Sequence, residues 1–260
     1  MKPRSLILLA SFLIVRAHAQ SVLFDFDSLA PHSGLPAAYT VDGITASLAA
    51  TGQGFSIQPA NTLRLTPAGF AGNCIYPNSI NAADLLVSFS KPLIAFSILY
   101  APQELGCDDS ATMRVTAYMN STPVGTTTTN ATSLCVCTWQ ANILSIATTQ
   151  AFNHVVVHYD ARPPTCQDWG PIFLADNMTV TPMPPIILVN PAKVANGAFQ
   201  FSFTNTPSWP FTVFGATNPA LPFSNWTTLT GLTEAPPGQF LFLDPQATNT
   251  PRRFYRVTSP

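Results

Sequence analysis

Two histidines and two glutamates are the first side chains to consider for chemistry in this sequence. His154 and His158 are separated by three valines, which favour a strand. At about 3.3 Å per residue, a strand would place these histidines roughly 13 Å apart, too far to hold one metal ion. Glu104 and Glu234 lie in different parts of the chain, so a glycosidase would need a pair of aspartates. Because no HExxH, G-x-S-x-G or phosphate-binding glycine motif occurs, we predict a non-catalytic protein.

A proline-rich segment, residues 162–171, is the best candidate for a ligand site. It begins with Arg162, contains three prolines and places Trp169 directly after Asp168. Sugar sites combine an aromatic face with nearby polar groups that bind hydroxyls. We therefore expect Trp169, Asp168 and Arg162 to bind a ligand. In the alternative interpretation, Trp169 covers the end of a hydrophobic core.

The composition is that of a secreted β protein. Hydrophobic residues make up 47% of the 260 residues and charged residues only 9%, so neutral polar side chains must form most of the surface. Residues 20–181 contain ten acidic and four basic residues, a net charge of −6, whereas residues 186–260 have a net charge of +2. Neither balance is typical of a nucleic-acid-binding protein, which presents a basic face.

The N-terminus predicts export. Lys2 and Arg4 precede the apolar run 6–15, and Ala17 and Ala19 supply small residues at the expected cleavage site. We therefore predict a signal peptide at residues 1–19. Since no later segment is long and apolar enough to span a membrane, we expect a secreted or cell-surface protein.

Short alternating runs, with Gly, Pro, Asn and Asp between them, predict antiparallel sheets arranged as sandwiches or barrels. The run 113–119 alternates most clearly, with Met113, Val115 and Ala117 expected to face inward. Other strands of the first part are expected at 22–27, 39–48 around an Asp-Gly turn, 54–57, 62–65 and 172–181. Three prolines then predict a stiff linker at 182–185, between a first domain at 20–181 and a second at 186–260.

Two hairpins are expected in the first domain. The runs 85–89 and 94–98 flank Lys91-Pro92, which we interpret as a turn. The runs 142–146 and 152–159 form a similar pair. In a hairpin, the residues before the first strand and after the second meet at the end away from the turn.

The hairpins suggest how the five cysteines pair, because export permits disulfides. Cys74 and Cys107 would meet beyond the first hairpin. Beyond the second, Cys135 or Cys137 would approach Cys166. Cys135 is favoured because it lies further from the turn, as Cys166 does.

Several short sequence segments of the first domain resemble those of a known class of domains. They are the opening Phe24-Asp-Phe-Asp27, the segments 43–46 and 85–100, and the closing run 173–180. Together they resemble the jelly-roll domains of exported bacterial proteins, many of which carry PEP-CTERM sorting tails. That fold is similar to galactose-binding-like and carbohydrate-binding sandwiches. The resemblance implies a jelly-roll β-sandwich over residues 20–181 and a carbohydrate or another extracellular ligand.

The resemblance also implies a metal site. In carbohydrate-binding jelly rolls, acids on the first and last strands often hold a structural Ca²⁺, and here Asp25 or Asp27 and Asp176 occupy those strands. Two adjacent strands could bring such carboxylates together, and a hard cation would relieve their repulsion. In the alternative interpretation, Asp25 and Asp27 are solvated and Asp176-Asn177 caps a bulge.

The segment 186–260 resembles a C-terminal module of exported bacterial proteins, with a small fibronectin-III-like sandwich. The resemblance is carried by residues 199–204, 211–213, 216–218, 225–227, 238–244 and 253–257. We expect Trp226 to pack in the core. Arg252, Arg253 and Arg256 would either pair with Asp244 or form a basic docking patch.

These observations predict an exported all-β protein that binds carbohydrate or another extracellular ligand without catalysis. The alternative is a structural or adhesive component of the cell envelope with no small-molecule site. A glycan-active hydrolase, with an acid pair such as Asp160 and Asp168, is third.

Overall fold

The computed structural model describes residues 20–63, 66–102, 112–130, 140–161, 172–249 and 252–259. Within these ranges the chain is built of β-strands with three short 3₁₀ helices, which confirms the predicted all-β fold class. No helix in the described ranges is long and apolar enough to cross a membrane. The predicted signal peptide, residues 1–19, lies outside them.

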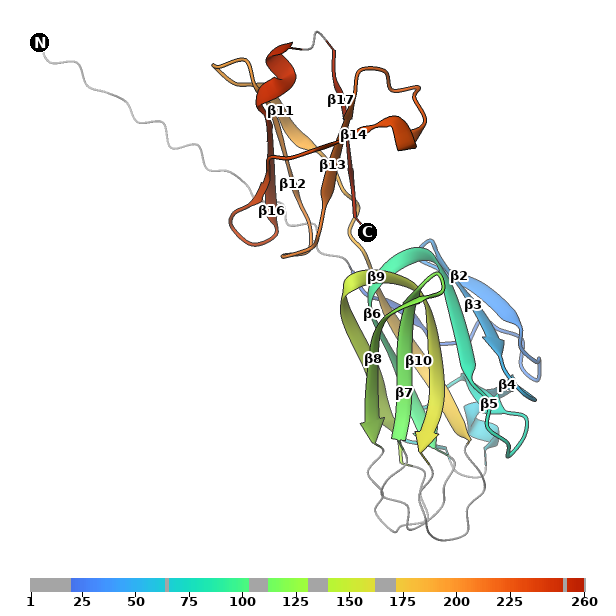
Figure 1. Cartoon of the computed structure of the whole chain (residues 1–260). Helices are drawn as coiled ribbons and strands as arrows, with labels where there is room; N and C mark the ends of the chain where they lie inside the picture. Colours follow the sequence, from blue (N-terminus) through green and yellow to red (C-terminus); the bar gives the residue numbers. More distant parts are fainter. Residues whose placement is uncertain are drawn as a thin grey trace, which may run out of the picture. The chain divides into compact units, whose positions relative to one another are not determined.

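The chain divides into two compact units, the first ending at Met183 and the second beginning at Pro184 (Figure 1). This division falls inside the segment 182–185, which the prolines mark as a linker. Pro182 itself closes the last strand of the first unit. The strands of that unit are β1 (Val22–Phe24), β2 (Ala37–Val41), β3 (Ile44–Ala50), β4 (Phe55–Pro59), β5 (Asn73–Pro77), β6 (Leu85–Pro102), β7 (Thr112–Met119), β8 (Thr122–Asn130), β9 (Asn142–Ala161) and β10 (Phe173–Pro182).

Two long strands, β6 and β9, organise the first unit (Figure 1). The early part of β6, residues 85–89, pairs with β3 and with residues 154–157 of β9. Its later part, residues 93–102, pairs with β10 and mainly with residues 142–147 of β9. The unit is therefore a sandwich in which both strands pass from one layer to the other. One layer has the order β2-β3-β6-β9-β7-β8 and the other β4-β5-β10-β6-β9, with β1 also on β10.

The two predicted hairpins are therefore wrong. Lys91-Pro92 interrupts the pairing of β6 with β9, where the register shifts between Ser88 and Leu93, but the chain continues in the same strand. Proline has no N–H to donate, so it suits such a break as well as a turn. A tight turn does occur between β2 and β3, where Asp42 and Gly43 both have positive φ, as their sequence predicts.

Strand alternation places the core between the layers. Met113, Val115 and Ala117 are fully buried, as predicted, and so are Val155 and Val157 on the neighbouring strand β9. A second, smaller cluster lies on the outer side of β5, β6 and β10. It consists of Ala60, Phe70, Cys74, Ala101 and Leu174. The segment between β4 and β5 covers this side and includes the 3₁₀ helix η1 (Ala60–Thr62). A strand was expected at 62–65, but Thr62 belongs to the helix, and residues 64–65 lie outside the described residues.

The second unit is a smaller sandwich of two sheets. Its elements are β11 (Val189–Lys193), β12 (Phe199–Thr204), β13 (Thr212–Ala216), η2 (Phe223–Asn225), β14 (Thr227–Leu229), β15 (Leu232–Glu234), β16 (Gln239–Asp244), η3 (Pro245–Asn249) and β17 (Phe254–Thr258). The sheets have the orders β11-β12-β16-β15 and β14-β13-β17. Both contribute to a phenylalanine-rich core around Phe203 and Phe242. Trp226 was expected there, but it is only half-buried and its indole N–H donates to the carbonyl of Leu221.

Candidate functional site

A row of polar side chains crosses four neighbouring strands of the first unit. Ser47 on β3 is the register partner of Ser88 on β6. Ser88 is the partner of His154 on β9, and His154 is the partner of Tyr118 on β7. The Ser88 Oγ lies 3.0 Å from the His154 Nδ1, and the Tyr118 and His154 ring centres are 5.8 Å apart. Hydroxyl, imidazole and phenol groups are thus gathered side by side.

The alternation of each strand makes these side chains face outward. Val87 and Val155 are fully buried, so their neighbours Ser88 and His154 must point to the opposite side of the sheet. His158 lies four residues further along β9, so it also points outward, and it is only partly buried. The prediction that both histidines lie on a strand, at surface positions, is confirmed. We call this side of β3, β6, β9, β7 and β8 the outer face.

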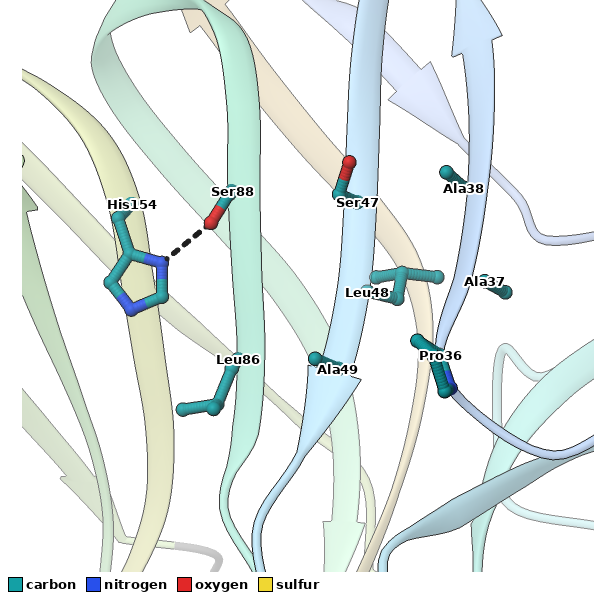
Figure 2. Close-up of a pocket in the computed structure, with 9 residues that line it drawn as sticks. All are labelled: Pro36, Ala37, Ala38, Ser47, Leu48, Ala49, Leu86, Ser88 and His154. Atoms are coloured by element: carbon teal, nitrogen blue, oxygen red, sulfur yellow. Dashed lines mark hydrogen bonds between the residues drawn. The ribbon is translucent and has the colours of Figure 1, made fainter.

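The outer face contains a hollow of about 470 Å³ beside His154 (Figure 2). Small side chains on β2 and β3, among them Ala38, Ser47 and Ala49, leave this space open. Leu86 and His154 bound it on the β6–β9 side. Ligand sites usually enclose roughly 300–1,000 Å³ with a few polar groups among apolar ones, and this hollow has both properties.

Burial lowers the pKa of His154 below its ordinary value, against a smaller opposing effect of a hydrogen bond with the Val87 backbone. The imidazole is therefore neutral near pH 7. A neutral imidazole has one nitrogen that donates and one that accepts, so it can bind a hydroxyl group in either sense. The pair Ser88–His154 thus offers both donors and acceptors to a polar ligand.

Charged side chains lie further along the same face, and they are paired with one another. The His158 Nδ1 is bonded to the Asp84 carboxylate. The Arg114 Nε donates to Asp160 at 2.7 Å, and its Nη1 donates to the hydroxyl of Thr116 at 3.3 Å. Because each acid is engaged by a base, this part of the face lacks the free carboxylate pair that a glycosidase requires.

The residues predicted to bind ligand, Trp169, Asp168 and Arg162, lie outside the described residues. So do Cys107, Cys135, Cys137 and Cys166. Ser47, Ser88 and Tyr118 were not predicted as site residues. Their outward positions could have been read from the alternation of each strand, but their meeting depends on the register between strands that are distant in the chain.

The structure brings the three predicted metal-site aspartates together. β1 pairs antiparallel with β10, so Asp25 and Asp27, just after β1, come near Asp176. Asp176 is fully buried, whereas Asp25 and Asp27 are exposed. The pKa of Asp176 is raised to about 6, mainly by burial and to a smaller extent by Asp27 and Asp25, against hydrogen bonds from the backbone N–H groups of Ala71 and Asn177 that lower it.

The oxygens of these carboxylates are already engaged. The N–H of Ala71 donates to Asp176 Oδ2 at 3.0 Å, and that of Asn177 donates to Oδ1 at 2.7 Å. The N–H of Asn73 donates to Asp27 Oδ1 at 2.6 Å. The acids thus tie the segment before β5 to β1 and β10. Asp176 lies at a bulge of β10, as in the alternative interpretation.

This donor set does not fit a metal ion as it stands. Among the described residues, no group of three or more His, Cys, Asp or Glu side chains is placed so that it could hold one. The aspartates serve instead as hydrogen-bond acceptors for a loop, and the calcium site stays a prediction.

Cys74 is a free thiol, so the expected pairing with Cys107 does not occur in this structure. Its side chain is fully buried in the small cluster beside Phe70 and Leu174. The pairing was derived from a hairpin that the chain does not form. Cys135, Cys137 and Cys166 lie outside the described residues, so the pairing of Cys135 or Cys137 with Cys166 stays a prediction, although the second hairpin does not form.

No family model matches the chain, and no curated protein matches it. Among solved structures, the K2 cleaved adhesin domain of Lys-gingipain is 16% identical with a TM-score of 0.39, covering 62% of this chain and 99% of that chain. The K1 domain of Lys-gingipain from Porphyromonas gingivalis W83 is 12% identical with a TM-score of 0.36, covering 63% and 98%. A glycoside hydrolase domain, Endo-D from Streptococcus pneumoniae R6, is 8% identical with a TM-score of 0.30, covering 94% and 41%. With TM-scores below 0.5, none of these likenesses carries an inference about what this chain binds.

Proposed function

We propose that this is an exported, non-catalytic protein whose first unit binds an extracellular carbohydrate through the outer face. The hollow beside Ser88 and His154 carries this proposal. It joins apolar surface from Pro36 and Leu86 to a row of hydroxyl and imidazole groups. A sugar ring presents C–H groups on its faces and hydroxyls at its edge, so it matches this combination.

The arrangement favours binding over catalysis. Ser88 and His154 are within hydrogen-bonding distance, but a nucleophilic serine also needs donors for the developing oxyanion. In the middle of a sheet, the backbone N–H groups nearby serve the strand ladders on both sides of β6. The paired state of Asp84 and Asp160 likewise opposes a glycosidase.

A glycan array tests the proposal, using the full chain and a variant that fills the hollow. Ser47→Trp places an indole in the open space from an exposed outward position, where the core is not disturbed. Thr122→Trp, at an exposed position of β8 outside the hollow, is the matched control. We expect the wild type and the control to bind the same glycans and Ser47→Trp to lose them.

Two results would count against the proposal. If the wild-type chain binds none of the glycans on the array, the result would support the structural or adhesive alternative. Unchanged binding by Ser47→Trp would move the site away from the hollow, for example to the segment with Trp169. Repeating the array with calcium and with a chelator tests the calcium prediction, because a structural Ca²⁺ would make binding depend on the ion.

A further inference from the structure

The second unit has a pocket of its own, independent of the outer face of the first. It encloses about 270 Å³ beside the loop that contains η2 and beside η3. Its lining is polar: Thr217, Asn225, Thr227 and Gln246 border it together with Arg253.

Arg253 is the residue that gives this pocket its chemistry. Its side chain is only 14% exposed and its Nη1 donates to Asp244 Oδ2 at 2.7 Å. Asp244 also accepts hydrogen bonds from the Tyr255 hydroxyl at 2.9 Å and the Gln246 N–H at 2.9 Å. These contacts hold the guanidinium in one orientation. Among the described residues, Asp244 is its one hydrogen-bonding partner, so Nε and Nη2 keep unused donors.

A glycine lies beside the Nε of Arg253. Gly215 lines the same pocket, and a Cβ on it would lie 3.0 Å from the Arg253 Nε. A side chain at this position would therefore crowd the Nε, which forms one edge of the guanidinium together with Nη2. That edge is a planar pair of donors, the arrangement that binds a carboxylate through two parallel hydrogen bonds.

The surrounding charges favour an anion with a single charge. Glu234 is the second acid of this unit, and it accepts hydrogen bonds from the backbone N–H groups of Ser208 and Gly238. Residues 186–260 have a net charge of +2, and Arg256 lies over the ring of Phe223, two residues before Asn225. Among the described residues, Arg253 is the one cation that lines the pocket, so this lining suits a carboxylate better than a doubly charged phosphate.

We propose that the second unit captures a carboxylate through the Nε–Nη2 edge of Arg253, with Asn225 and Gln246 binding neighbouring polar groups. The carboxylate could belong to an acidic sugar or to the C-terminus of a peptide, which share this chemistry. The site is separate from the glycan-binding hollow, and either can exist without the other.

Calorimetric titration of the full chain tests the proposal with two pairs of probes. Galacturonate is compared with galactose, and an N-acetylated dipeptide with a free carboxylate is compared with its amide. We expect one or both carboxylates to bind at least about tenfold more tightly than the neutral counterpart, a difference of about 1.4 kcal/mol. Binding of galacturonate alone would identify the ligand as an acidic saccharide. Binding of the dipeptide with a free carboxylate alone would identify it as a peptide C-terminus.

Variants show whether Arg253 carries the binding. Arg253→Lys keeps the charge but removes the planar edge, so we expect at least a tenfold loss. Thr217→Trp fills the pocket from an exposed loop position without touching the Arg253–Asp244 pair, and it serves if Arg253→Lys does not fold. Arg252→Ala, at the exposed neighbouring arginine, should bind like the wild type. Equal binding of the neutral probes by a chain that carries Ser47→Trp, no binding of either carboxylate, or full binding by Thr217→Trp would overturn the proposal.

The outcome is distinguishable from that of the proposed function. Ser47→Trp, which fills the hollow of the first unit, should leave carboxylate binding unchanged. Loss of glycan binding with retained carboxylate binding would separate the two sites.

Discussion

Replacing Asp176 by asparagine probes the most unusual electrostatic feature of the first unit. Burial raises the pKa of this carboxyl group to about 6 from its ordinary value of 3.8. The folded state therefore binds a proton more tightly than the unfolded state does. Stability contributed by protonation is fully present below about pH 4 and is lost as the pH rises through about 6.

The size of this effect follows from the pKa difference. About two pH units, at 1.36 kcal/mol each, correspond to roughly 3 kcal/mol in the free energy of unfolding between about pH 4 and pH 7. Asparagine cannot ionise, so the variant lacks this dependence. It also places an NH₂ group against one of the N–H donors of Ala71 and Asn177, which costs about 1–3 kcal/mol for an unpaired buried donor.

Hydrogen–deuterium exchange measured on peptides of β10 provides the assay, because it reports on the first unit alone. After correction for the intrinsic exchange rate, we expect the wild type to gain protection relative to Asp176→Asn as the pH falls from about 7 to 4. The difference cancels the contributions of the other acids. A difference that stays constant with pH, or that shrinks on acidification, would refute the reasoning. If added calcium reverses the trend for the wild type only, the predicted metal site exists.

Three further predictions concern packing and ion pairs. Gly72→Ala should lower the free energy of unfolding by about 2 kcal/mol or more in chemical denaturation, because φ is +56° and the new Cβ would lie 1.9 Å from Asp27 Oδ1; unchanged stability would contradict the described loop. Cys74 should resist alkylation by iodoacetamide in the folded protein, since burial raises the pKa of its thiol to about 12; peptide mapping that finds it modified would disprove its burial. Asp244→Ala should cost about 3–5 kcal/mol because it leaves Arg253 buried without its partner, whereas Asp160→Ala, in a half-exposed pair, should cost less than about 1 kcal/mol; equal losses in thermal unfolding would contradict this contrast.

The sequence alone predicts much of the local structure because strand periodicity is a property of the backbone. Alternation correctly assigned Met113, Val115 and Ala117 to the core and placed His154 and His158 at surface positions of a strand. The positive φ that Asp and Gly tolerate identified the turn at Asp42-Gly43.

The direction of the chain after a break could not be predicted in the same way. Lys91-Pro92 is compatible with a turn and with an interruption inside a strand, since both remove a ladder hydrogen bond. Which of them forms depends on the strands beside it, here β9 and β10, and in the structure β6 continues through the break in its pairing. The Cys74–Cys107 pairing was derived from a hairpin at this point, and Cys74 is a free thiol.

The candidate sites depend still more on contacts between distant segments. Ser88 meets His154 across 66 residues, and the Ala71 N–H reaches Asp176 across 105. Residue types and alternation determined which side chains are available and which side of a strand they occupy. The register between strands far apart in the chain is set only when the layers pack. In the first unit, this packing assembled the row beside the hollow and buried Asp176. In the second unit, it placed Arg253 beside a glycine.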